Sequence, residues 1–203
     1  MTTNVYIDGF NLYYGTVKNT PYRWLNLAEL CHLLLPGDHI KRIKYFTAKV
    51  KALPRDPGQP GRQSVYLRAL TTIANLEIFY GHFLSNQVMM PLANGSGFVS
   101  VVKTEEKGSD VALATHLLHD AHKDEYDIAV IVSNDSDLIP PIRVVRQDFG
   151  KQVGLICPQK RICEALANEV HFRKQIRDGV LKASQFPDKM TDSVGSFQKP
   201  ASW

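Results

Sequence analysis

Acidic side chains follow the ends of two predicted strands. The short apolar run Val5–Ile7 leads directly into Asp8, and a strongly apolar strand predicted over 127–132 is followed by Asp135 and Asp137. The carboxyl ends of strands in an open α/β sheet lie at one edge, which is where such folds bind ligands. We therefore expect these three carboxylates to lie close together at that edge.

A fourth acid, Asp110, falls in the first turn of a helix predicted over Gly108–Lys123. On a helical wheel it shares a face with the apolar residues that should pack on the sheet, which are Leu113, Ala114, Leu117 and Ala121. The opposite side carries His116, His119, Asp120 and Lys123. Because an unpaired buried carboxylate is unfavourable, four acids without an obvious arginine among them predict a bound cation. Ligands that are all oxygen favour Mg²⁺ or Mn²⁺.

Each of these acids also has a purely structural interpretation. Asp137 can cap the helix that follows it, Asp110 can be a first-turn acid favoured by the helix dipole, and Asp8 before Gly9 can form a turn. Taken singly, the residues leave these alternatives open. Their common position at one predicted edge favours the metal site.

The elements that would position these residues alternate between apolar strands and amphipathic helices, which predicts an α/β fold around a mostly parallel sheet. Strands are expected over 5–7, 40–50, 77–83, 98–103, 127–132 and 153–157. Helices are expected over 10–17, 27–35, 63–76, 108–123, 138–149 and 161–168, with a loop over 54–61 and a turn over 90–97. We expect residues 1–186 to form a single domain and residues 187–203, rich in Ser, Thr and Lys, to form a polar tail outside the core.

The composition limits the class of protein. Of the 203 residues, 44% are hydrophobic and 22% charged, so a packed core is expected and general disorder is excluded. The net charge of +4 is compatible with a nucleic-acid partner but too small to argue for one. No apolar run reaches the roughly 18 to 20 residues of a membrane span, and the first residues do not resemble a signal peptide. Three cysteines without metal-ligand spacing make disulfides unexpected, so we expect a cytoplasmic protein with no membrane partner.

Three segments resemble the signature blocks of the NYN domain family, which are PIN-like domains related to metal-dependent ribonucleases. The segments are Tyr6–Gly15, Glu106–Ala114 and Val132–Pro140, and the resemblance extends over about residues 4 to 170. It implies a Rossmann-like, PIN-like three-layer sandwich with an acidic Mg²⁺ or Mn²⁺ site and, in active members, RNA cleavage. The family's acidic residues are matched by Asp8, Asp110, Asp135 and Asp137, and its polar neighbour by Asn11. Asn134 stands where such proteins often have glycine.

The implied chemistry is hydrolysis of an RNA phosphodiester bond. This reaction needs an activated water and neutralisation of the charge that develops on phosphate, and one or two divalent ions can supply both. We expect Asp8 and Asp135 to be metal ligands, direct or through water, and Asp110 and Asp137 to complete the cluster or orient the attacking water. Candidate partners of phosphate or metal-bound water are Asn11, Ser133 and Ser136, and Lys107 could offset phosphate charge.

A basic stretch could form the path of single-stranded RNA. Between His39 and Leu76 the sequence has eight Lys or Arg residues and one acid, Asp56. We expect Lys49, Lys51 and Arg55 to form a positive rim that attracts a polyanion which the carboxylates alone would repel. The alternative is a solvated strand edge with a mobile loop.

Other functions are compatible with parts of the sequence. A non-catalytic RNA-binding or regulatory protein could retain the same fold, and a homodimer is one assembly open to such a chain. An aspartyl phosphatase would need a second aspartate at position 10, where Phe10 stands. Zinc binding by His116, His119 and His122 is less favoured than a solvated face, and Tyr13 and Tyr14 could either stack on bases or belong to the core.

Overall fold

A computed structural model describes all 203 residues of the chain. Its strands are β1 (Thr2–Asp8), β2 (His39–Ala48), β3 (Leu76–Pro91), β4 (Phe98–Lys107), β5 (Ile128–Val132), β6 (Gln152–Cys157), β7 (Phe172–Gln175), β8 (Lys189–Asp192) and β9 (Gly195–Gln198). Its α-helices are α1 (Gly9–Leu12), α2 (Leu27–Leu34), α3 (Gln59–Leu70), α4 (Ser109–His122), α5 (Ile139–Gln147), α6 (Glu164–Ala167) and α7 (Asp178–Ala183). The π-helical turn η1 (Tyr13–Val17) continues α1, and the 3₁₀ turn η2 (Ser136–Leu138) leads into α5.

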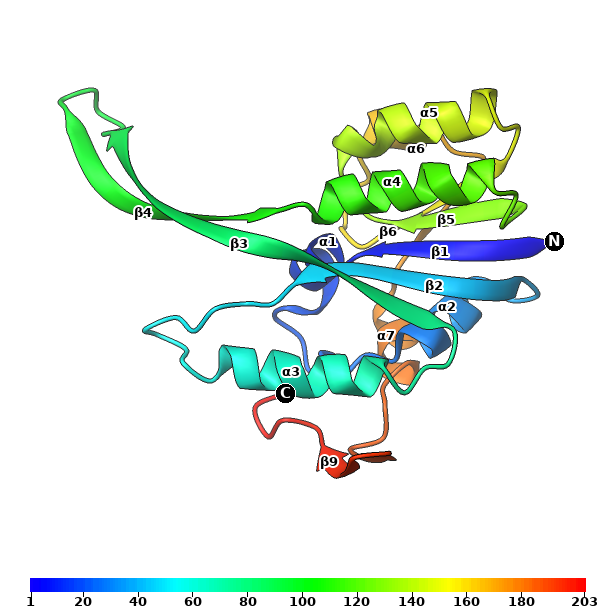
Figure 1. Cartoon of the computed structure of the whole chain (residues 1–203), viewed down its shortest axis with the longest axis horizontal. Helices are drawn as coiled ribbons and strands as arrows, with labels where there is room; N and C mark the ends of the chain where they lie inside the picture. The colour runs from blue at the N-terminus through cyan, green and yellow to red at the C-terminus, as the bar shows by residue number, and fades with distance from the viewer.

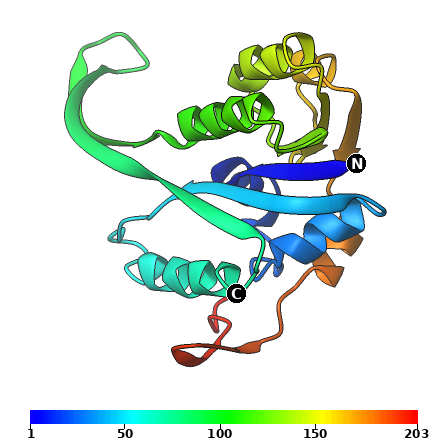
Figure 2. The same cartoon turned by 45° about the vertical axis from the view of Figure 1, so that its right-hand side comes forward.

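A seven-stranded sheet in the order β4-β3-β2-β1-β5-β6-β7 forms the centre of the molecule (Figure 1). Every neighbouring pair in it is parallel except β3 and β4. Helices cover both faces: α2, α3 and α7 lie on one, and α4 and α5 on the other (Figures 1 and 2). This confirms the predicted α/β three-layer sandwich with a mostly parallel sheet.

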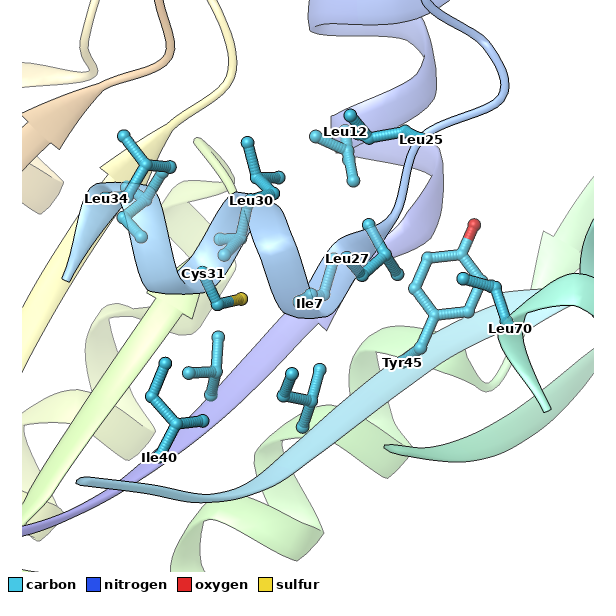
Figure 3. Close-up of a cluster of buried hydrophobic side chains, with 14 of the residues drawn as sticks. Ile7, Leu12, Leu25, Leu27, Leu30, Cys31, Leu34, Ile40, Tyr45 and Leu70 are labelled. Carbon is cyan, nitrogen blue, oxygen red and sulfur yellow. The ribbon is translucent and has the colours of Figure 1, made fainter. Parts of the chain in front are cut away.

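The central strands are buried on both faces, as expected for a parallel sheet covered by helices. In β1, Val5 and Ile7 point into the core below α2, whereas Tyr6 points into the core below α4. Figure 3 shows the first of these cores, in which Leu27, Leu30 and Cys31 of α2 gather with Ile7 of β1. Because β1 is fixed from both sides, Asp8 at its end has a defined position at the sheet edge.

Helix α3 starts earlier and ends earlier than the sequence pattern predicts. It begins at Gln59, inside the stretch 54–61 expected to be a loop, because Pro60 lies in the first turn, where no backbone donor is needed. It ends at Leu70 rather than 76, and a short turn then leads to β3 at Leu76.

Strands β3 and β4 form a long hairpin arm that leaves the body of the molecule (Figure 1). β3 pairs with β2 only as far as Gly81, and from His82 to Pro91 its partner is β4 alone. Both strands are longer than the predicted 77–83 and 98–103. Residues 84–102 of this arm carry no charged side chain, and Phe98 and Val102 are among its exposed apolar residues.

The segment expected to be a polar tail is folded against the body. β8 and β9 pair as a hairpin, and Arg68 of α3 holds Asp192 through two hydrogen bonds of 2.7 Å. Trp203 packs against Trp24 and Tyr66, with ring centroids 6.4 and 5.7 Å away. The prediction that this segment lies outside the core is therefore wrong, because its few apolar side chains complete the hydrophobic layer around α3. β7 and α7 were also not predicted.

Asp120 of α4 is buried, whereas the helical wheel placed it on the solvent side. It is 5% exposed, and its Oδ2 forms an ion pair with Lys44 Nζ at 2.7 Å and accepts a hydrogen bond from the Tyr6 hydroxyl at 2.6 Å. The reason is that Asp120 lies seven residues after Leu113 and three after Leu117, on a buried face that is wider than the apolar stripe.

None of the helices is long and apolar enough to cross a membrane.

Candidate active site

Asp8 stands at the carboxyl end of β1 and is 3% exposed. It caps α1 by accepting a hydrogen bond from the Asn11 backbone N–H at 2.9 Å, and it also accepts from Asn11 Nδ2 at 2.8 Å. A third bond, of 2.9 Å, comes from Ser133 Oγ. Burial raises the pKa of the Asp8 carboxyl, and these hydrogen bonds oppose that increase. Asp8 thus caps α1 and also lies at the edge of the sheet where such folds bind ligands.

Ser133 connects the two acidic strand ends. Its side chain is completely buried, donates to Asp8, and accepts a 3.2 Å bond from the Asp135 N–H. Asp135 in turn caps η2 by accepting a 3.0 Å bond from the Asp137 N–H. The buried hydroxyl of Ser133 holds Asp8 and the Asp135 backbone in place, whereas Ser136 is exposed in η2. Contact of either serine with phosphate or a metal-bound water stays a prediction.

Asp110 is exposed at the start of α4, at the same edge as the strand ends. Its pKa is raised to about 6, first by partial desolvation and then by the negative charges of Asp8, Asp135, Glu106 and Asp137. The four predicted acids therefore lie close enough to act on one another electrostatically. Asp110 projects from the helix end rather than facing the sheet as the wheel suggested.

Glu106, which sequence reasoning did not single out, is a fifth acid at this edge. It is the penultimate residue of β4, and its carboxylate accepts bonds from Ser109 N at 3.1 Å and Ser109 Oγ at 2.7 Å at the start of α4. Gly81 of β3 allows this approach, because a Cβ there would collide with the Glu106 carboxylate and the Lys107 carbonyl. The signal in the sequence was again an acid at the end of a strand.

A cleft of about 240 Å³ brings part of this set together. Its polar lining comes from Asp8, Asn11, Glu106, Ser109 and Asp110, and its apolar lining from Phe10, Tyr14 and Phe83. Asp135 and Asp137 lie outside this lining, beyond Ser133. The cleft is therefore lined by carboxylates from β1, β4 and α4.

The donor set matches what Mg²⁺ or Mn²⁺ requires, with one restriction. All the side chains concerned offer oxygen, but no three His, Cys, Asp or Glu side chains lie close enough to surround a metal ion. Mg²⁺ normally keeps several waters and is held through one or two carboxylates plus substrate phosphate, so a preformed cage is not needed. The acids fit such an ion, with Asp8 and Asp110 lining the cleft. The three histidines of α4 form no metal-binding group.

Asn134 fastens the loop after β6 beside the acids. Its Nδ2 donates to Gln159 Oε1 at 2.6 Å and to the Arg161 carbonyl at 3.0 Å, and its Oδ1 accepts from Cys163 N at 2.7 Å. Gln159 then donates to Asn11 Oδ1 at 3.2 Å. Both ends of the Asn11 amide are thus engaged, by Asp8 and Gln159, so Asn11 positions Asp8.

Most of the cations in the basic stretch are paired, and a few are not. Lys41, Arg42, Lys44, Arg62 and Arg68 form ion pairs with Glu125, Glu77, Asp120, Asp56 and Asp192. Lys49 lies over the Tyr80 ring, 5.3 Å from its centroid, and Lys51 and Arg55 are exposed. Lys107 pairs with Glu105 at 3.2 Å. The unpaired charge of this stretch is therefore concentrated at 49–55.

Comparison with known proteins places this arrangement in a family. The model of the NYN domain matches residues 2–175. The sequence is 30% identical over 236 residues to 6-hydroxy-3-succinoylpyridine 3-monooxygenase HspA of Pseudomonas putida, an alignment covering 100% of this chain and 75% of that protein. The fold is similar to the crystal structure of a protein of unknown function from Vibrio parahaemolyticus, with a TM-score of 0.56 and 15% identity over 87% of this chain and 93% of that one. The chain belongs to the NYN domain family.

Proposed function

We propose that this protein is a Mg²⁺- or Mn²⁺-dependent ribonuclease that hydrolyses RNA phosphodiester bonds at the acidic cleft. The observation that carries the proposal is the crowding of carboxylates at the ends of β1, β4 and β5. The charges that act most strongly on Asp110 are all negative, and no cation lies among them. A divalent ion would relieve this repulsion, and the family match favours nuclease chemistry.

The residues divide into ligands and positioning groups. Asp8, which lines the cleft, and Asp135, just beyond its lining, would hold the metal directly or through water. Asp110 and Asp137 would complete the cluster or orient the attacking water. When bound, the ion would lower the pKa of a water and neutralise charge on the phosphate. Asn11 and Ser133 keep Asp8 in place through the hydrogen bonds described above.

The rim at Lys49, Lys51 and Arg55 would bring single-stranded RNA to the cleft. These side chains belong to the segment that follows β2, whose neighbour β1 carries Asp8. Because they are exposed and bear no paired acid, their field attracts a polyanion. This contribution is electrostatic and independent of RNA sequence.

A cleavage assay on generic single-stranded RNA tests the proposal. The wild type should cleave with Mn²⁺ and not with chelator, and Asp135→Asn, which keeps the shape and removes the charge, should abolish cleavage. The matched control is Asp178→Asn, a first-turn acid of α7 outside the cluster. Equal cleavage by Asp135→Asn and wild type, prepared side by side, would refute the assignment. RNA binding without any metal-dependent cleavage would instead support a non-catalytic RNA-binding protein.

A second candidate, hydroxylation of a small aromatic acid, is favoured by one specific observation. A cavity lined by tyrosines and Trp203 lies beside the acidic cleft, and the Pseudomonas relative is named for oxidation of a substituted pyridine. The test is incubation with 6-hydroxy-3-succinoylpyridine in air-saturated buffer, followed by chromatography. Dioxygen supplies the inserted oxygen, and reduced nicotinamide cofactor with flavin supplies the two electrons that convert its second oxygen to water. Turnover that survives Asp135→Asn would favour it over the ribonuclease.

A further inference from the structure

A second cavity, here called the aromatic cavity, lies on the other side of the ridge formed by α1 and η1. Phe10 and Tyr14 on this ridge line both the acidic cleft and the aromatic cavity. Its volume is about 130 Å³. An apolar protein cavity of roughly 150 Å³ binds a single benzene ring, so this space suits one planar six-membered ring.

The walls of the aromatic cavity are rich in rings. They include Tyr13, Tyr14, Tyr45, Tyr66 and Trp203. Trp203 is held in place by Tyr66 and Trp24, and Tyr13 meets Tyr14 edge-on with centroids 5.2 Å apart. Tyr14 is 60% exposed, and Lys18 Nζ lies over its ring, 4.6 Å from the centroid. Stacking on such side chains favours a flat aromatic ligand and tolerates different ring chemistries.

Arg23, which lines the aromatic cavity, has a side-chain N–H without a hydrogen-bond acceptor. Its Nε is buried and has no hydrogen-bond partner, and its guanidinium forms no ion pair. The other arginine of the cavity, Arg62, is already paired with Asp56. A buried N–H without a partner is unfavourable, and a guanidinium binds the paired oxygens of carboxylates and phosphates particularly well. An anionic group would supply the missing acceptor.

We propose that the aromatic cavity binds a planar aromatic ring that carries an anionic group, with the ring among Tyr13, Tyr14 and Trp203 and the anion at Arg23. Thr47 and Gln59, which also line the cavity, offer polar groups to the edge of the ring. The proposal does not depend on cleavage at the acidic cleft. Two sources share this chemistry: a nucleoside monophosphate unit of RNA and a free aromatic carboxylic acid.

Tryptophan fluorescence of the full chain tests the proposal directly, because Trp203 is one of only two tryptophans and lines the cavity. Titrations with uridine monophosphate, adenosine monophosphate and nicotinate are carried out in chelator, so that a metal at the acidic cleft plays no part. Saturable quenching by at least one ligand is expected, and it should be absent in Trp203→Phe. The neutral analogues uridine, adenosine and nicotinamide should bind more weakly.

Arg23→Gln should weaken binding of the anionic ligand about tenfold or more, since a hydrogen bond to a charged group contributes roughly 1.5–3 kcal/mol. It should leave binding of the neutral analogue nearly unchanged. The matched control is Arg173→Gln, which removes an exposed arginine of β7 outside the cavity. If Arg23→Gln does not fold, as judged by circular dichroism, Tyr14→Ala replaces it, because Tyr14 is exposed and its loss should weaken all ligands.

The outcomes distinguish the two ligand sources, and they distinguish this proposal from the ribonuclease proposal. Binding of nucleotides alone identifies a base subsite, and binding of nicotinate alone identifies a small-molecule site; either supports the aromatic cavity as a ligand site. No saturable binding of any ligand, or equal affinity in wild type, Arg23→Gln and Tyr14→Ala, overturns it. Asp135→Asn should bind as the wild type does, so failure of the ribonuclease proposal leaves this result unaffected.

Discussion

Neutralising Asp110 should stabilise the metal-free protein at neutral pH. Its pKa is about 6 in the folded protein against 3.8 for an ordinary aspartate, because burial and four neighbouring acids disfavour the charged form. Between these two pH values the folded state binds a proton that the unfolded state has released, so the free energy of unfolding falls as pH rises. The penalty is absent below pH 3.8 and fully present above about pH 6. Asp110→Asn removes it.

The size of the effect follows from the shift and the exposure of the residue. The difference between a pKa of 3.8 and one of about 6 corresponds to roughly 3 kcal/mol. Asp110 is exposed, so solvent screening reduces this to about 1 kcal/mol, or about 2–4 °C in melting temperature for a chain of this size. Asp178→Asn, which removes a first-turn acid outside the cluster, should instead destabilise by about 0.3–1 kcal/mol because only the helix-dipole interaction is lost.

Thermal and urea unfolding in chelator at pH 7.5 and pH 4.5 measures both variants. At pH 7.5, Asp110→Asn should unfold at a higher temperature and a higher urea concentration than the wild type. At pH 4.5, the two proteins should unfold at nearly the same temperature and urea concentration. With millimolar Mn²⁺ at pH 7.5 the order should reverse, because the ion binds the wild-type folded state more tightly. If Asp110→Asn is less stable than wild type at both pH values and Mn²⁺ changes neither, the acids are isolated helix caps, and the reasoning about a charge cluster is refuted.

Three further perturbations test other parts of the structure. Lys44→Met leaves Asp120 buried without its cationic partner and should lower the free energy of unfolding by about 3–5 kcal/mol, as measured by urea unfolding. The double variant Lys44→Met/Asp120→Leu should recover part of this loss. A loss under about 1 kcal/mol would contradict the buried pair. Replacing Lys49, Lys51 and Arg55 with alanine should reduce the slope of log RNA affinity against log salt by up to about 2, at roughly 0.7 per phosphate contact, without changing Mn²⁺ binding; an unchanged slope would place the RNA elsewhere. The uncharged stretch of the arm exposes apolar side chains, so we expect copies of the chain to associate through it at high concentration. Met89→Glu/Val102→Glu should then shift the size-exclusion profile toward the monomer, whereas an unaltered profile would show that the arm is not a contact between copies.

The sheet and the place of the acids could be predicted because they depend on short, local patterns. The apolar runs of β1 and β5 are buried on both faces, and each leads directly into a carboxylate. A parallel sheet then brings those ends to one edge whatever the rest of the chain does. The metal, the RNA and the individual catalytic roles remain predictions, since neither the sheet nor the family match determines them.

The errors in α4 come from treating the helix as an isolated wheel. The wheel placed Asp110 on the face that packs on the sheet and Asp120 on the opposite side, whereas in the structure Asp120 is buried and Asp110 is exposed. Which of the two carboxylates is buried depends on the partners that the sheet offers. Lys44 of β2 and Tyr6 of β1 lie where Asp120 meets the sheet, whereas Asp110 projects from the helix end at the sheet edge. A buried carboxylate needs such partners, and they are about 80 and 110 residues away in the sequence.

The C-terminal segment shows the same limitation at a larger separation, and there it bears on function. Its polar composition is typical of a tail, yet Arg68 pairs with Asp192 at a separation of 124 residues and Trp203 packs on Tyr66. These contacts bring the last residue beside η1, near the start of the chain, and so complete the wall of the aromatic cavity. Arg23 stands out only in that setting, because the lack of an acceptor is a property of the folded surroundings and not of the local sequence. The acidic cleft could thus be anticipated from strand ends, whereas the aromatic cavity exists only because distant segments meet.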